Sequence, residues 1–178
     1  MPELIVKSPD DCLSIEIGAF IAFVRAGGEV SIQGLSERIR DATALVFARV
    51  DGLVIGVAAL KQPQPSYRRR VSSESGAPIP ATEFPYELGW VYVSPESRGK
   101  GYSLLLSQAA LAKNKGAGVF ATSRTDNIAM HRSLAKHGFV ATGKPFTSGR
   151  GRHLVQVFVR HAAQSGKGRH HSGPPHTP

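Results

Sequence analysis

The sequence predicts an α/β fold in which a mixed sheet of seven strands carries helices on both faces. Short runs rich in β-branched residues alternate with longer segments whose apolar residues have helical spacing. Turn signals separate these runs, and Asp51-Gly52 is a strong hairpin signal. The length of 178 residues suits one domain, because a chain of this size can bury a single core without disulfides or metals.

The first part of the chain predicts three strands and two helices. In order, they are a strand at 4–6, a helix at 12–25, a shorter helix at 35–41, and strands at 43–50 and 53–60. Asp10 or Asp11 is the expected N-cap of the first helix, and Gly27-Gly28 is the expected end.

The segment 62–85 has a different composition from its surroundings. It contains five prolines, several serines and the run Arg68-Arg69-Arg70, with neither helical nor strand periodicity. We therefore expect a long loop without regular structure. Such a loop serves either as a lid over a substrate or as a mobile surface excursion.

The rest of the domain alternates strands with two helices. The expected order is a strand at 86–93, a helix at 101–115, a strand at 119–122, a helix at 127–137, and strands at 139–142 and 154–160. The residues expected to face the core are Leu104, Leu105, Ala109 and Ala112 in the first helix and Ile128, Leu134 and Ala135 in the second.

Composition limits the function classes. We expect one domain at 1–161 and a disordered basic tail at 162–178, in which His170, His171 and His176 make no specific metal site. The single cysteine, Cys12, and the lack of a membrane-spanning stretch or secretory signal favour the cytoplasm. A net charge of +9 fits nucleic acid, a polyphosphate cofactor, an acidic substrate or solubility alone.

The most informative segment connects the strand at 86–93 to the next helix. Its turn reads Arg98-Gly99-Lys100-Gly101-Tyr102-Ser103. A glycine-rich turn into a helix leaves backbone amides free at the positive end of the helix dipole, which suits a phosphate. Arg98 and Lys100 add complementary charge. The alternative is a basic helix N-terminus with no ligand.

Two better-known phosphate loops do not fit this segment. A P-loop requires glycine where Ser94 stands and a hydroxyl residue where Gly101 stands. A dinucleotide fingerprint that begins at Gly99 requires its third glycine at Leu104. The segment therefore belongs to another class of phosphate site.

The turn resembles the pyrophosphate-binding motif of the GNAT superfamily of acyl-coenzyme A dependent N-acyltransferases. That motif is Gln or Arg, two residues, Gly, one residue, then Gly or Ala, and Ser103 stands at the last position here. A second family element, Asn followed by a helix that ends in Gly-Phe, is matched from Asn127 to Gly138-Phe139. The resemblance covers 4–160 and implies the GNAT-like, mostly antiparallel seven-stranded sheet, with the order β-α-α-β-β-β-α-β-α-β-β.

The resemblance implies acetyl-CoA as cofactor and direct attack by an amine in a ternary complex. Such transfer requires a base for the ammonium proton and donors for the oxyanion. The family's glutamate, eleven residues before the motif, corresponds to Glu87. Strand alternation places Glu87 on the same face as Val91 and Val93, whose main chains are the expected contacts for the acyl carbonyl and the pantetheine arm. Glu87 as an exposed strand residue is the alternative.

The family's second element implies a further cofactor contact and a proton donor. Asn127 is the expected contact to the pantetheine arm, and as an N-cap it can serve both roles. The tyrosine that often protonates the thiolate is replaced by Leu134. Ser133, His131 or water can substitute, and a catalytically weak binder of acyl-CoA is the alternative.

The acceptor is left open by the sequence. Arg68, Arg69 and Arg70 favour a small-molecule or peptide amine that carries carboxylate or phosphate, although a solvated charged loop explains them equally well. Two rival functions are acetylation of aminoacyl-tRNA, as in GNAT toxins, and acyl-CoA sensing without turnover. The resemblance also allows a homodimer.

Overall fold

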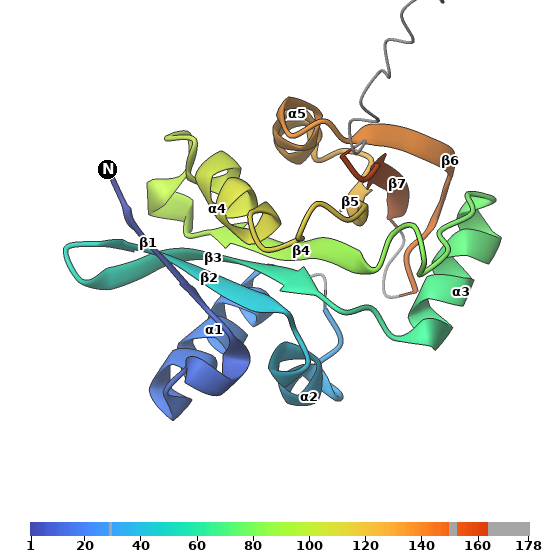
Figure 1. The fold of residues 1–178 in the computed structure, drawn as a ribbon. Coiled ribbons are helices and arrows are strands. Elements are labelled where there is room, and N and C mark those ends of the chain that lie inside the picture. Colours follow the sequence, from blue (N-terminus) through green and yellow to red (C-terminus); the bar gives the residue numbers. More distant parts are fainter. Residues whose placement is uncertain (29, 150–152, 164–178) are drawn as a thin grey trace, which may run out of the picture.

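The computed structural model describes residues 1–28, 30–149 and 153–163. Its seven strands form one sheet in the order β1-β2-β3-β4-β5-β7-β6 (Figure 1). Neighbouring strands are antiparallel except β4 and β5, which are parallel. The predicted mixed and mostly antiparallel sheet is therefore confirmed.

The elements follow the predicted order with one addition, the helix α3. The strands are β1 (Glu3–Lys7), β2 (Ala44–Val50), β3 (Leu53–Lys61), β4 (Tyr86–Val93), β5 (Val119–Arg124), β6 (Val140–Thr147) and β7 (Leu154–Arg160). The helices are α1 (Ser14–Ala26), α2 (Leu35–Arg40), α3 (Pro65–Ser75), α4 (Tyr102–Leu111) and α5 (Ile128–Lys136). Two short 3₁₀ turns, η1 (Pro9–Asp11) and η2 (Pro95–Ser97), complete the set.

Local turn chemistry explains where several elements begin and end. Asp51 and Gly52 both have positive φ, 50° and 78°, so the β2–β3 hairpin has the backbone of a type I′ turn. The predicted N-cap of α1 is wrong, because Asp10 and Asp11 lie in η1. The helix starts later, where the Leu13 amide donates to the Glu16 carboxylate over 2.9 Å.

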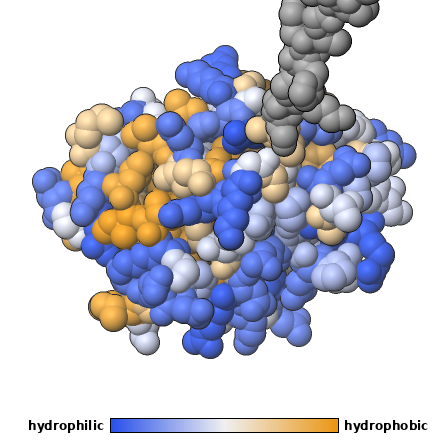
Figure 2. Space-filling view, viewed as in Figure 1, coloured by the Kyte–Doolittle hydropathy of each residue, from blue (hydrophilic) through white to orange (hydrophobic). Residues whose placement is uncertain are grey.

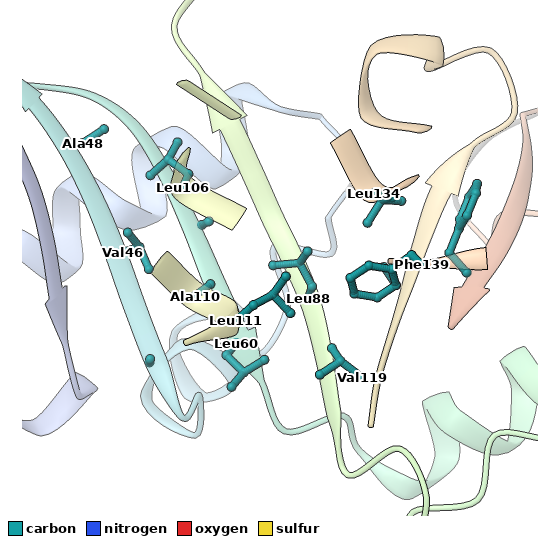
Figure 3. Packing of buried hydrophobic residues seen from close by; sticks show 14 of the residues in the cluster. Val46, Ala48, Leu60, Leu88, Leu106, Ala110, Leu111, Val119, Leu134 and Phe139 are labelled. Atoms are coloured by element: carbon teal, nitrogen blue, oxygen red, sulfur yellow. The ribbon is translucent and has the colours of Figure 1, made fainter. Parts of the chain in front are cut away.

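Helices cover both faces of the sheet (Figure 1). On one face α4 and α5 enclose a core that includes Leu106, Ala110 and Leu134 (Figure 3). On the other face α1 and α2 pack on β2 and β3, and α3 packs on β5, β6 and β7. Alternate residues of β2 divide between these cores, since Val46 belongs to the first and Phe47 to the second.

The predicted core faces of α4 and α5 are only partly correct. The fully buried residues of α4 are Leu106, Ser107, Ala110 and Leu111, whereas Ala112 is exposed. In α5, Leu134 is fully buried but Ile128 is 53% exposed. Helix α4 carries apolar residues around much of its circumference, so spacing alone does not single out its buried face, whereas Ile128 is exposed because it begins α5.

The expected loop at 62–85 is also wrong, because its first half forms α3. Pro65 occupies the first turn, where its missing amide costs no hydrogen bond, and Gly76 ends the helix with φ of 68°. Val71 and Ser75, four residues apart, are the buried residues of α3, and Val71 packs against residues of the sheet. A Cβ on Gly143 of β6 would lie 2.6 Å from the Ser75 carbonyl oxygen, so this glycine permits the close packing of α3 on β6.

Most of the visible surface is hydrophilic, with an apolar area where β1 and α4 lie (Figure 2). Leu4 of β1 is 36% exposed there, and Val6 is half-buried. Within the described part of the chain, no helix combines the length and the apolar character needed to cross a bilayer. The three tail histidines, with Lys167 and Arg169, lie outside the described residues.

Candidate functional site

A bulge in the middle of β4 organises the candidate site. Gly89 pairs with Ala59 and Tyr92 with Val57, so two residues of β4 oppose the single residue Ala58. Trp90 has φ of 52°, a conformation rare for a bulky residue. The strand therefore changes its alternation at Trp90.

This bulge overturns the predicted common face of Glu87, Val91 and Val93. The side chains of Val91 and Val93 pack with the α4 and α5 core, as that of Leu88 does. The side chain of Glu87, next to Leu88 in the regular part of β4, points to the opposite face. Val91 and Val93 still offer their main chains, which lie in the plane of the sheet.

The parallel strands β4 and β5 separate just beyond Glu87. Their pairing consists of Tyr86 with Val119 and Glu87 with Phe120. Beyond this point, β4 has no strand partner on its β5 side among the described residues. The split between the two strands therefore opens next to Glu87 and runs along β4 past the main chain of Val91 and Val93.

The turn before α4 has the backbone expected of an anion site. Gly99 and Gly101 have φ of 78° and 77°, and nothing within 4 Å would meet a Cβ at either. In the described chain, the amides from Gly99 to Ser103 donate to no other group. They precede or begin α4, a helix of ten residues, so its dipole adds to their positive potential.

The two cations of this turn differ in their contacts. The Arg98 Nε donates to the Val93 carbonyl oxygen over 3.1 Å, and the guanidinium lies 5.5 Å from the centre of the Tyr92 ring. Lys100 is exposed. Arg98 therefore ties the turn to the end of β4, while Lys100 is free to reach an anion in solvent.

On the other face, Glu87 is buried in a network of side chains. The residue is 2% exposed. Its Oε2 accepts from Lys61 Nζ over 2.7 Å, and its Oε1 accepts from the Tyr67 hydroxyl over 3.0 Å. The alternative interpretation of Glu87 as an exposed strand residue is thus wrong. Two donors hold its side chain in place.

Tyr67 joins the two separating strands. Its hydroxyl lies 3.2 Å from Thr122 Oγ1 on β5 while it donates to Glu87 on β4. Burial raises the pKa of the Tyr67 phenol far above its ordinary value, and the Glu87 charge raises it further. Tyr67 therefore keeps its proton, and Thr122 is the donor in the second contact.

The three arginines of α3 have different environments. Arg68 donates to the carbonyl oxygens of Ile79, Phe84 and Pro85 and so connects α3 to the start of β4. Its guanidinium also lies 5.3 Å from the centre of the Phe120 ring. Arg68 thus has a structural role that the sequence did not predict, and its substrate role stays a prediction.

Arg69 and Arg70 are both exposed. Arg70 lies 5.8 Å from the centre of the Tyr67 ring and 3.7 Å from Glu74, so it stands beside the Glu87 network. The structure gives Arg69 no such position near the site.

The second predicted element lies on the α4 side. Asn127 caps α5, since its Oδ1 accepts from the Met130 amide over 3.1 Å, and the residue is exposed. Leu134 is fully buried, whereas the His131 ring contacts the Arg124 carbonyl oxygen over 2.9 Å. Ser133 is buried, and its hydroxyl has no hydrogen-bond partner in the described chain.

Sequence reasoning missed Lys61, Tyr67 and Thr122. They come from β3, α3 and β5, and no local motif connects them with Glu87. A polar residue at the end of an otherwise apolar strand, as Lys61 is in β3, is the one signal that points to a buried partner.

Comparisons with known proteins identify the family of the chain. The model of the acetyltransferase (GNAT) family matches residues 17–139. No curated protein sequence gives a match.

Several solved structures share the fold of this chain. A phosphinothricin acetyltransferase from Sinorhizobium meliloti, in complex with AcCoA, has a TM-score of 0.65 at 17% identity, over 91% of this chain and 89% of that chain. An acyl-CoA N-acyltransferase from Pseudomonas aeruginosa has a TM-score of 0.60 at 17% identity, and the match covers 90% of this chain and 99% of that chain. A ribosomal-protein-alanine N-acetyltransferase from Brucella melitensis has a TM-score of 0.59 at 18% identity, and the match covers 88% of this chain and 99% of that chain. These names differ in their acceptors, so the shared fold does not identify an acceptor.

Proposed function

The chain belongs to the acetyltransferase (GNAT) family, and from this premise we propose that it transfers an acetyl group from acetyl-CoA directly to a primary amine. The observation that carries the proposal is the buried Glu87 carboxylate beside the split between β4 and β5. Glu87 is paired with Lys61 and lies where the two strands separate, so its carboxylate is next to the only break in the pairing of β4 and β5 that the described residues show. It lies on the face opposite α4, so cofactor and acceptor can approach the split from different sides.

The turn before α4 is the proposed site for the pyrophosphate of the coenzyme. Its unpaired amides and its glycines with positive φ suit a phosphate that approaches the backbone closely. Arg98 and Lys100 supply charge, Tyr102 and Ser103 begin the helix, and Asn127 is the proposed contact to the pantetheine arm. The relative from Sinorhizobium meliloti, solved with AcCoA, supports the choice of coenzyme.

Glu87 is the proposed general base. When bound, acetyl-CoA supplies a thioester carbonyl that an amine can attack. A carboxylate has about four lone-pair positions, and Lys61 and Tyr67 use two of them. Glu87 can therefore still accept a proton from an ammonium group, directly or through a water. The Val91 amide is the proposed donor to the charge that develops on the carbonyl oxygen.

Among the described residues, no strong donor stands at the family's usual position to protonate the departing thiolate. Leu134 offers none, and we assign the step to water or to the buried Ser133 hydroxyl. A thiolate leaves readily, so loss of the usual tyrosine is compatible with turnover. Three further points stay predictions: a cytoplasmic location, assembly as a homodimer, and the rival function of acetylating aminoacyl-tRNA.

The test measures thiol release from acetyl-CoA with a panel of primary amines, together with calorimetric binding of the coenzyme. We expect release that depends on the amine. Tight coenzyme binding with no release for any amine would instead identify a sensing module. Absence of coenzyme binding would refute the proposed cradle as well.

A further inference from the structure

An internal ammonium group occupies the acceptor side of the candidate site. Lys61 Nζ lies 2.7 Å from Glu87 Oε2, 4.9 Å from the centre of the Trp90 ring and 5.6 Å from that of Tyr67. A carboxylate and aromatic faces are the groups that proteins use to bind ammonium ligands. Lys61 therefore fills a surrounding that suits any primary ammonium.

The backbone of β4 leaves space for this group. A Cβ on Gly89 would lie 2.8 Å from Lys61 Cδ and 3.2 Å from its Nζ. A side chain at Gly89 would therefore force Lys61 to move, so the glycine leaves room for the Lys61 side chain in its present position. The bulge that follows turns Trp90 toward the same face, where it packs with the α1 and α2 core.

We propose that Glu87, Trp90 and Tyr67 form a receptor for a primary alkylammonium group, and that Lys61 occupies it until an acceptor replaces it. The link to an acceptor rests on the proposed function, whereas the binding of an ammonium ligand does not. Two ammonium groups in this space would repel each other, so Lys61 and the ligand exclude one another.

Lys61 is suited to leave the receptor. Its side chain is 16% exposed, so a path to solvent exists, and its stem of four carbons can adopt several rotamers. Departure also frees Oε2 of Glu87, which is the atom nearest to the entering ammonium. The same exchange therefore brings in the ligand and leaves its ammonium group beside the carboxylate that we propose as the base.

The shape of the occupant indicates the class of acceptor. A receptor filled by a lysine side chain fits an ammonium on an unbranched alkyl chain, as in an aminoalkyl compound or a lysine side chain. An amine on a branched carbon carries a substituent that the lysine side chain lacks, so the space that Lys61 fills does not match it. The inferred acceptor class is therefore an unbranched aminoalkyl compound.

The first test removes Lys61 and supplies the missing atoms. Trp90 is the single tryptophan of the chain, so its fluorescence reports on the receptor. We expect Lys61→Ala to bind n-propylammonium saturably, and at least about tenfold more weakly when Glu87→Gln is added, because a charge-assisted hydrogen bond is lost. Isopropylammonium and the neutral n-propanol should both bind about tenfold more weakly than n-propylammonium.

Three results of this test would overturn the inference. They are no saturable binding to a folded Lys61→Ala protein, equal binding of n-propanol, and equal binding of n-propylammonium by the wild type. The first indicates no receptor, the second a mere cavity, and the third that Lys61 is not the occupant.

The second test uses the wild type and needs no variant to fold. Lysine reactivity toward an acylating reagent is read residue by residue by mass spectrometry, with the exposed Lys113 as internal reference. We expect the ratio of Lys61 to Lys113 labelling to rise severalfold with n-propylammonium and not with n-propanol. An unchanged ratio would overturn the inference.

Neither test contains acetyl-CoA, so the outcomes separate the two proposals. Ammonium binding without any acetyl transfer would leave the receptor standing and refute the proposed function. Acetyl transfer without ammonium binding at Glu87 would do the reverse.

Discussion

The two sides of the split between β4 and β5 use different groups, main-chain amides on one side and side chains on the other. The turn before α4 is exposed, consists of consecutive residues and offers main-chain amides. The Glu87 network is buried, consists of side chains from β3, α3, β4 and β5, and depends on their packing. A backbone site tolerates changes of side chain but not of glycine conformation. A packed network tolerates neither a lost charge nor a lost donor.

The largest expected effect comes from Glu87→Gln, which keeps the shape of the side chain and removes the base. We expect a loss of about 10²- to 10⁴-fold in kcat with unchanged affinity for the coenzyme. Thiol release and calorimetry measure the two quantities. The exposed Glu83→Gln is the matched control, and an unaltered kcat in Glu87→Gln would remove Glu87 from the chemistry.

Arg68→Met is expected to weaken the acceptor side alone. It removes charge-assisted bonds to three carbonyl oxygens, so we expect a loss of about 2 kcal/mol in the free energy of unfolding, with lower turnover. Urea denaturation provides the measurement. The neighbouring exposed Arg69→Met should change stability by less than about 0.5 kcal/mol. Equal effects of both variants would contradict the role of Arg68.

Gly101→Ala is expected to weaken the coenzyme side alone. A Cβ at φ of 77° costs about 1–2 kcal/mol, which the turn can relieve only by moving its amides. We expect coenzyme affinity to fall about tenfold in calorimetry. Gly116→Ala is the matched control, because Gly116 has the same φ, equally open surroundings and no place in the turn. If both variants bind the coenzyme like the wild type, the cradle is not the binding site.

Glu16 provides a smaller contrast, because it is a paired carboxylate away from the split. Its carboxylate lies 2.8 Å from Lys7 and 3.2 Å from Arg49. The hydrogen bond from Lys7 and then that from the Leu13 amide lower the pKa of Glu16 below its ordinary value of 4.5. Glu16→Gln should therefore cost about 1 kcal/mol of stability at neutral pH and leave turnover unchanged.

The sign of this effect follows from the lowered pKa. The charged form favours the folded state, so the stabilisation is complete above pH 4.5 and disappears as the pH falls through the folded-state pKa. Denaturation at neutral pH and near pH 3 should show the difference between wild type and variant shrinking in acid. A difference that stays constant would contradict this role of Glu16.

The contrast between the two sides also explains what sequence could predict. The turn before α4 is local, so glycine spacing could predict its backbone, and its role as a cradle stays a prediction. Apolar runs predicted the bounds of β4 and β7. The segment at 62–85 was misassigned because prolines and serines obscured the signals of α3, although Pro65, Gly76 and the spacing of Val71 and Ser75 were present. The bulge at Trp90 reverses the strand faces, and its one sequence signal, the isolated Gly89 inside the strand, was not used. The partners of Glu87 meet only through tertiary packing.

A crystal structure of the protein with coenzyme A tests the central claim most directly. We expect pyrophosphate oxygens within roughly 3 Å of the amides from Gly99 to Ser103, and a thiol that enters the split between β4 and β5 toward Glu87. A pyrophosphate bound elsewhere, or a thiol that stays on the α4 face away from the split, would contradict it.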